Sequence, residues 1–113
     1  MLTKGDLKPE KKVEVPKPAI EEVDLHIELL LDKFNHLSSG EIVAIQIARF
    51  RTSLETAILH RTKKIVFIHG VGNGKLKHEI RKILDTEHRS KARYQDASFK
   101  EYGYGATMVL VKQ

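Results

Sequence analysis

The sequence predicts an α+β fold, a two-layer sandwich in which two helices cover one face of a four-stranded mixed sheet. Two observations predict it. Short segments with strand patterns occur at four places in the chain, and long segments with helical periodicity separate the first three. The elements therefore follow the order β-α-β-α-β-β. Right-handed crossovers between parallel strands place both helices against the same face.

The chain has 113 residues, a length that suits one folded domain. Its beginning differs in composition from the rest, because residues 1–20 contain five lysines and the prolines Pro9, Pro16 and Pro18. This composition is typical of a flexible linker. We therefore expect a linker at residues 1–20 and a folded domain at residues 21–113. The linker either follows an upstream domain of a longer chain or is the tail of a complete small protein.

The first strand is expected at residues 22–26. There, the apolar Val23 and Leu25 alternate with the polar Asp24 and His26, which is the pattern of a half-buried strand. This alternation places Asp24 and His26 on the same side of the strand.

The first long helix is expected at residues 41–59. Ser38 and Glu41 precede it with the spacing of a capping box, in which each side chain accepts the backbone N–H of the other residue. The apolar residues that follow recur at steps of three and four, as on one face of a helix: Val43, Ile47, Phe50, Leu54 and Ile58.

Residues 64–69 are a continuous β-branched and aromatic run, apart from the polar residue at each end. This run is typical of a central strand. The second long helix is expected at residues 75–88. Its buried stripe consists of Leu76, Ile80, Ile83 and Leu84.

The last two strands are expected at residues 94–99 and 106–111. A turn at residues 101–105 joins them, so they are predicted to form a hairpin. We expect Tyr94 and Phe99 to pack in the core or to stabilise the hairpin. Base stacking is the functional alternative for the aromatic residues of this region, which are Tyr94, Phe99, Tyr102 and Tyr104.

Positive charge is concentrated in residues 61–100. This segment holds eleven Lys and Arg and four Asp and Glu, an excess of 11 − 4 = +7, against a net charge of +5 for the whole chain. Such a segment suits a polyanion such as nucleic acid. The chain has no cysteine, which excludes disulfides and thiolate chemistry. It has neither a signal peptide nor an apolar stretch of roughly 20 residues, so a cytoplasmic protein without membrane partners is expected.

A glycine-rich turn, residues 69–74, stands between the second strand and the second long helix. Its glycines at alternate positions, Gly70, Gly72 and Gly74, permit positive φ angles and close approach of a ligand to the backbone. The amides of Gly72, Asn73 and Gly74 are expected to point outward together at the start of a helix, where a phosphate binds well. A tight turn without a ligand is the alternative. The glycine spacing matches neither the dinucleotide fingerprint nor the triphosphate loop, so no nucleotide cofactor is predicted.

Two histidines are expected at one edge of the sheet, because His26 and His69 end consecutive parallel strands. Asp24 stands two residues before His26. A carboxylate that orients an imidazole in this way suits acid–base chemistry. A metal site formed by Asp24, His26 and His69 and a purely structural role for the histidines are left open.

Three ordered motifs resemble those of the small MutS-related (Smr) domain family. The sequence Val-Asp-Leu-His-Ile at residues 23–27 is similar to the family's Leu-Asp-Leu-His-Gly. The His-Gly-x-Gly-x-Gly motif stands at residues 69–74, with a leucine after it at Leu76. Residues 105–111 are similar to the family's ending, Gly-x-Thr-x-Val-x-Leu. The resemblance extends over about residues 22–112.

The resemblance implies a two-layer α+β fold like the C-terminal domain of translation initiation factor three. It also implies nucleic-acid binding and, in several members, nicking or endonuclease activity on DNA or RNA. Asp24 and His26 match the motif positions implicated in cleavage, whereas His69, Gly70, Gly72 and Gly74 match the second motif. Members are often C-terminal modules behind a linker.

The sequence departs from the family pattern at two positions. Ile27 replaces the usual glycine of the first motif, and Val71 stands where a lysine or arginine is frequent. The neighbouring Lys75 is expected to supply the missing positive charge.

Together, these features predict a nucleic-acid-binding domain with endonuclease activity. The amides of residues 72–74 and Lys75 would hold a backbone phosphate, and His26, oriented by Asp24, would move a proton. His69 or Arg81 would stabilise charge at phosphorus. Further binding contacts would come from basic residues of the second helix, Lys77, Arg81 and Lys82. The alternatives are a non-catalytic nucleic-acid-binding module and a protein-interaction module.

Overall fold

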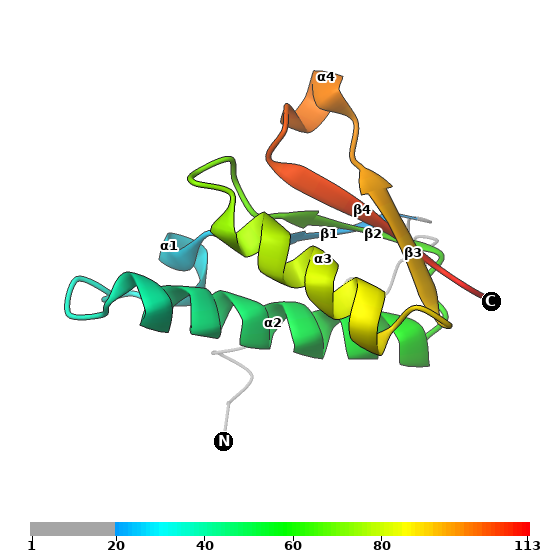
Figure 1. Cartoon of the computed structure of the whole chain (residues 1–113), viewed down its shortest axis with the longest axis horizontal. Coiled ribbons are helices and arrows are strands. Elements are labelled where there is room, and N and C mark those ends of the chain that lie inside the picture. Colours follow the sequence, from blue (N-terminus) through cyan, green and yellow to red (C-terminus); the bar gives the residue numbers. More distant parts are fainter. Residues whose placement is uncertain (1–19) are drawn as a thin grey trace, which may run out of the picture.

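A computed structural model describes residues 20–113, which form a mixed four-stranded sheet with helices (Figure 1). The strands are β1 (Ile20–Asp24), β2 (Lys64–Ile68), β3 (Ala92–Asp96) and β4 (Ala106–Val111). Their order across the sheet is β1-β2-β4-β3. β1 is parallel to β2, whereas β4 is antiparallel to both of its neighbours. The predicted mixed sheet and the pairing of its last two strands are therefore confirmed.

The linker predicted at residues 1–20 lies outside the described residues, except for Ile20, which begins β1. The expected domain boundary at residue 21 therefore falls just inside the first strand. Among residues 20–113, no helix combines the length and the apolar character needed to cross a membrane.

Two long helices, α2 (Ser39–Leu59) and α3 (Lys75–Glu87), lie within two residues of their predicted bounds. The predicted capping box is present at the start of α2. The Ser38 hydroxyl oxygen accepts the N–H of Glu41 at 3.1 Å, and the Glu41 carboxylate accepts the N–H of Ser38 at 3.0 Å. These bonds satisfy two amides at the helix terminus and fix where α2 begins.

Strand β1 ends earlier than predicted, so His26 lies beyond the strand and not within it. The cause is local. The Asp24 carboxylate accepts the N–H of His26 at 2.9 Å, so this amide takes no part in the sheet. His26 instead precedes a short helix, α1 (Ile27–Leu30), which the sequence did not predict.

Strand β3 also differs from its predicted bounds of residues 94–99, because it begins at Ala92 and ends at Asp96. After β3, the carbonyl of Ser98 accepts the N–H groups three and four residues later and closes a short helix, α4 (Phe99–Tyr102). Phe99 is therefore 63% exposed, so its expected place in the core was wrong, whereas its ring contacts Tyr104 within the segment that joins β3 and β4. Tyr94 packs against the main core, as expected.

Side chains of β2 alternate between the two faces of the sheet, as the two-residue period of a strand requires. Ile65 and Phe67 belong to the main core, together with buried residues of α2 and α3. Phe67 contacts Phe50 of α2 edge to face, with 4.7 Å between ring centroids. Val66 belongs to a second, smaller cluster with Tyr102 of α4. Both long helices therefore cover one face, as predicted (Figure 1).

Replacing Ser38 by alanine removes the acceptor that caps α2. We expect the free energy of unfolding in urea to fall by about 1 kcal/mol, because one amide of the first turn loses its partner. Ser38→Asp is the matched control, since its carboxylate restores an acceptor. Equal losses in both variants would contradict the capping role.

Candidate active site

The parallel pairing of β1 with β2 brings the segments that follow the two strands to one edge of the sheet (Figure 1). Leu25 continues this pairing just beyond β1, since its N–H donates to the carbonyl of Ile68 at 2.8 Å. His26 follows Leu25, and the glycine turn, residues 69–74, follows β2. The two histidines therefore belong to one rim, as the sequence predicted, but their rings have different surroundings.

The glycine turn is fastened to the loop that precedes β4. The carbonyl of Gly105 accepts the N–H of His69 at 3.0 Å and that of Gly70 at 2.9 Å. A Cβ added to Gly105 would lie 3.3 Å from the Cα of Gly70, closer than most Cβ contacts, so a larger residue would require a small backbone shift. Sequence analysis placed Gly105 in a turn and a motif but did not predict its contact with Gly70. This contact joins segments that are far apart in the sequence.

Gly70 lies directly against the imidazole of His26. Its φ is +78°, in the region that favours glycine, and an added Cβ would lie 3.0 Å from Nε2 of His26. Both the backbone conformation and the space therefore require glycine here. The contact places Nε2 of His26 beside the backbone of the glycine turn.

Asp24 orients the ring of His26. Nδ1 of His26 lies 2.6 Å from Oδ1 of Asp24, and the same oxygen accepts the backbone N–H of His26 at 2.9 Å. The side chains are 42% and 34% exposed, so solvent and a ligand reach the pair. With the Nδ1 proton donated to the carboxylate, Nε2 of the neutral imidazole is an unprotonated acceptor.

The amides of the glycine turn differ in their availability. The N–H of Gly74 donates to the carbonyl of Val71 at 3.1 Å, so it does not point outward as expected. The N–H of Lys75 donates to the side-chain oxygen of Asn73 at 2.9 Å. Within the described part of the chain, the amides of Gly72, Asn73 and Leu76 have no acceptor. Two of the three predicted amides, with that of Leu76, therefore remain available to an anion.

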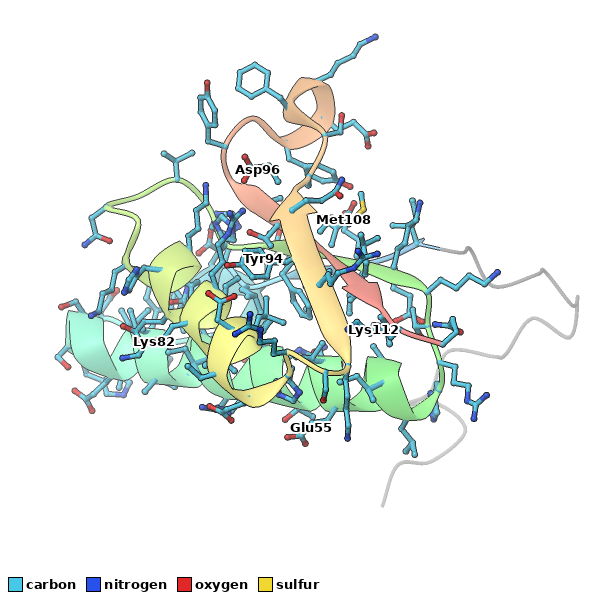
Figure 2. The ribbon with its side chains drawn as sticks, turned by 45° about the vertical axis from the view of Figure 1, so that its right-hand side comes forward. Glu55, Lys82, Tyr94, Asp96, Met108 and Lys112 are labelled. Carbon is cyan, nitrogen blue, oxygen red and sulfur yellow. The ribbon has the colours of Figure 1, made fainter. Side chains whose placement is uncertain are left out.

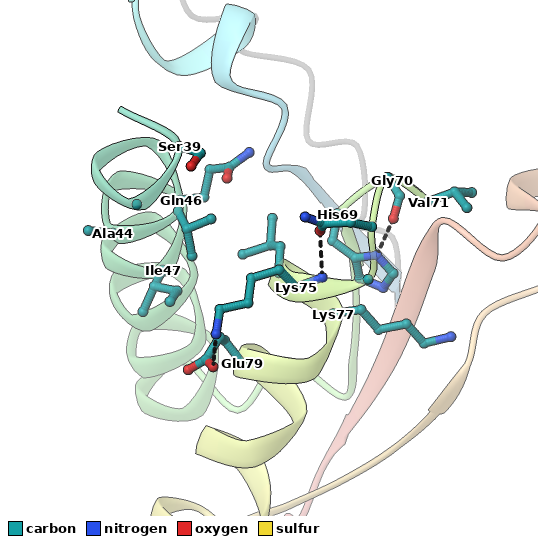
Figure 3. Close-up of a pocket in the computed structure, with 16 residues that line it drawn as sticks. Ser39, Ala44, Gln46, Ile47, His69, Gly70, Val71, Lys75, Lys77 and Glu79 are labelled. Carbon is teal, nitrogen blue, oxygen red and sulfur yellow. Dashed lines mark hydrogen bonds and ion pairs between the residues drawn. The ribbon is translucent and has the colours of Figure 1, made fainter. Parts of the chain in front are cut away.

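A groove of about 660 Å³ separates the glycine turn from the first half of α2 (Figure 3). Its lining combines the whole turn, the start of α3 and the N-terminal part of α2, including Ser39 and Ile47. Figure 3 shows Lys75 on the groove side of α3, whereas Lys77 leaves the helix in another direction. Asp24 and His26 do not line the groove, and the ring of His26 lies beside the turn, next to Gly70.

His69 is buried within a chain of hydrogen bonds. Its side chain is only 7% exposed. Nδ1 donates to the carbonyl of Gly70 at 2.7 Å, so Nε2 accepts the hydroxyl proton of Thr107 at 3.0 Å. The Thr107 oxygen in turn accepts from Nε and Nη2 of Arg81, at 3.2 and 2.9 Å. The sequence assigned no role to Thr107, which is fully buried and joins these two residues.

Burial lowers the pKa of His69 below its ordinary value, and the nearby Lys77 and Arg81 act in the same direction. The neutral ring also fits the hydrogen bonds, since Nε2 must accept. Residues 20–113 contain no group of three Asp, Glu, His or Cys side chains placed to hold a metal ion. The open alternative of a metal site from Asp24, His26 and His69 therefore does not form, because the ring of His69 contacts Thr107 instead.

Three of the predicted phosphate-binding cations, Lys75, Lys77 and Arg81, have acidic partners. Lys75 pairs with Glu79 at 3.2 Å. Arg81 and Lys77 lie 2.6 and 3.6 Å from one carboxylate oxygen of Asp96, at the end of β3 (Figure 2). Arg81 and Lys77 hold the pKa of Asp96 below its ordinary value. The cations differ in exposure, since the side chain of Lys75 is 59% exposed, against 30% for Lys77 and 23% for Arg81.

The chain belongs to the Smr domain family, whose model matches residues 44–112. The matched part contains the glycine turn, Thr107, Gly105 and the cations of α3. Asp24 and His26 precede the matched part. The comparison that covers these two residues is an alignment over 109 residues with a protein from Aquifex aeolicus.

Two similar proteins are both described as "Endonuclease MutS2". The one from Aquifex aeolicus is 30% identical over 109 residues, which is 96% of this chain but 13% of that protein. The one from Finegoldia magna is 36% identical over 59 residues, 52% of this chain and 7% of that protein. This chain therefore spans a small part of either relative.

A solved structure, the Smr domain of Thermus thermophilus MutS2, has a similar fold. It superimposes with a TM-score of 0.63 and 28% sequence identity, and the match covers 82% of this chain and 99% of that chain. The α+β fold expected from the resemblance is therefore confirmed.

Replacing Gly70 by alanine should displace the imidazole of His26, because the new Cβ has no room beside Nε2. We expect a shift in the ¹⁵N resonances of that ring and a loss of stability of more than about 1 kcal/mol. Gly72→Ala is the matched control, since Gly72 also has a positive φ but nothing lies within 4 Å of an added Cβ. Equal displacement of His26 in both variants would show that the Gly70 contact does not hold the ring.

Replacing His69 by glutamine should reduce the loss of stability in acid. Because the folded protein lowers the pKa of His69, the stability contributed by its neutral ring is complete above about pH 6.5 and is lost as the pH falls through the folded-state pKa. Urea unfolding at pH 7.5 and pH 5 should show a smaller difference for His69→Gln than for the wild type. The same difference in both proteins would exclude a buried, neutral His69.

Proposed function

We propose that this chain binds the backbone of a nucleic acid at the glycine turn and cleaves a phosphodiester bond with His26 as the acid–base group. The observation that carries the proposal is the contact of Nε2 of His26 with Gly70 while Nδ1 is held by Asp24 at 2.6 Å. A phosphate at the turn would then lie beside an imidazole nitrogen that is free to accept a proton.

The amides of Gly72, Asn73 and Leu76 are among those of the turn and the start of α3 that have no acceptor within the described residues. They lie at the N-terminus of α3, whose dipole favours negative charge. Lys75, with a side chain 59% exposed, adds a cation on the groove side. This arrangement supports binding of a phosphate that belongs to a longer polymer.

His26 is assigned the proton transfer. Its Nε2 takes a proton from the water or hydroxyl that attacks phosphorus, and the bond between phosphorus and the leaving oxygen breaks. The imidazolium then returns the proton to the leaving oxygen, which balances the reaction. Asp24 stabilises the imidazolium and holds its orientation throughout.

His69 and Arg81 are assigned positioning roles in place of the charge stabilisation that the sequence suggested. Both ring nitrogens of His69 have partners within the protein, and one of them fixes the carbonyl of Gly70. Arg81 is bound to Thr107 and Asp96. These contacts support a chain of bonds that holds the turn in shape.

The relatives support this class of activity, because both similar proteins are described as endonucleases. The chain corresponds to 7% and 13% of their lengths, so the activity of the whole relatives is carried over here as a proposal. Binding without cleavage is the second candidate. Lys75, Lys77 and Arg81 would contact the nucleic acid in either case, so these residues do not distinguish binding with cleavage from binding alone.

His26→Ala should abolish nicking of supercoiled DNA or cleavage of structured RNA while leaving binding within about twofold, because the phosphate contacts remain. Parallel reactions with and without a chelator would reveal any need for a metal ion. His60→Ala is the matched control, since His60 is exposed at the other end of α2 from the glycine turn. Asp24→Asn should slow cleavage and retain binding.

Cleavage by His26→Ala at the wild-type rate would overturn the role of His26. Salt-sensitive binding by the wild type with no cleavage of either substrate would favour the non-catalytic binding module. Failure to bind nucleic acid even at low salt would favour the protein-interaction module.

A further inference from the structure

Two aromatic side chains of the segment between β3 and β4 are exposed side by side. Phe99 is 63% and Tyr104 is 67% exposed, and their ring centroids lie 4.8 Å apart with a tilt of 58°. Phe99 is the first residue of α4, and Tyr104 lies in the turn after α4. The two rings contact each other. The two adjacent rings give this segment an exposed aromatic surface on which a flat, apolar group could stack.

The segment that carries the two rings is anchored on its inner side. Tyr102 packs in the small cluster with Val66, and its hydroxyl donates to the carboxylate of Glu22 on β1. This bond raises the pKa of Tyr102 to about 12. The N–H of Gly103 also donates to the carbonyl of Phe99 at 2.8 Å. The inner contacts therefore hold the outer rings in place before any ligand arrives.

The exposed rings adjoin the candidate active site. Tyr104 directly precedes Gly105, whose backbone touches Gly70, and Gly70 in turn touches His26. Consecutive Cα atoms are about 3.8 Å apart, so Tyr104 lies within a few residue lengths of the imidazole. Val71, on the other side of the Gly70 contact, is itself 63% exposed. Apolar surface thus flanks the place assigned to the phosphate.

We propose that Phe99 and Tyr104 form a stacking site for an unpaired base next to the phosphate held at the glycine turn. The site rests on the proposed nucleic-acid binding and adds a preference for single-stranded substrate. Charge favours a nucleic-acid strand over a protein segment as the occupant, because residues 61–100 carry an excess of seven positive charges, although α4 itself carries one exposed charge of each sign, Lys100 and Glu101. Stacking on aromatic rings tolerates any base and needs the base to be unpaired.

The test compares the affinities of variants for fluorescein-labelled thymidine or uridine 12-mers and for a blunt 12-base-pair duplex. The double variant Phe99→Ala/Tyr104→Ala should weaken single-strand binding at least about fivefold, with duplex affinity unchanged. Leu59→Ala is the matched control, because Leu59 is 77% exposed at the far end of α2. Both rings are exposed, so the double variant should fold normally.

Tyrosine fluorescence gives an independent readout, since the chain has three tyrosines and no tryptophan. Binding of the thymidine 12-mer should quench the wild-type emission. Tyr104→Phe should keep the affinity, because phenylalanine also stacks, and should lose much of the quenching.

The outcomes separate the stacking site from the proposed function. If the double variant binds the single strands as tightly as the wild type does, the stacking site alone is overturned. Equal weakening of single-strand and duplex binding would have the same consequence. Self-association of the wild type that the double variant abolishes, with unchanged nucleic-acid affinity, would assign the rings to a protein contact and overturn the proposal. No binding of any probe by the wild type would overturn the proposed function as well.

Discussion

The carbonyl of Gly105 accepts two consecutive amides, those of His69 and Gly70, and the candidate site is built around this junction. It ties the glycine turn to the segment before β4 so closely that a Cβ on Gly105 would lie only 3.3 Å from the Cα of Gly70. Gly70 is then placed against the imidazole of His26, which reaches the same edge because β1 is parallel to β2. Three segments distant in sequence therefore converge on one glycine.

The two sides of the junction differ in chemistry. On one side, Asp24 and His26 are partly exposed, and Nδ1 of His26 lies 2.6 Å from Oδ1 of Asp24. On the other side, His69 is buried and kept neutral by its surroundings, in a bonded series that runs from Arg81 through Thr107 to the carbonyl of Gly70. The proposed function therefore gives the two histidines of one rim separate tasks, since exposure suits proton transfer and burial suits positioning.

Much of the fold was predictable because it depends on local patterns. The periodicity of α2 and α3, the Ser38 capping box and the continuous apolar run of β2 are properties of neighbouring residues. The strand ends were less predictable. His26 was placed within β1, whereas the side chain of Asp24 takes its amide out of the sheet.

Most members of the candidate site were predictable, with the exception of Thr107, but many of their contacts were not. The spacing of Asp24 and His26 indicated their pairing, which the structure contains at 2.6 Å. The burial of His69 and its bond to Thr107 depend on packing between β2, β4 and α3, which no local pattern reveals. The exposure of Phe99 likewise follows from a helical turn that alternation in the sequence did not indicate.

The most direct test of a phosphate site at the glycine turn is an NMR titration of ¹⁵N-labelled protein with a single-stranded oligonucleotide. The account predicts the largest amide shifts at Gly72, Asn73 and Leu76, accompanied by a shift of the His26 ring nitrogens and little change at the ring of His69. Shifts confined to other surfaces, with the glycine turn and His26 unchanged, would contradict it.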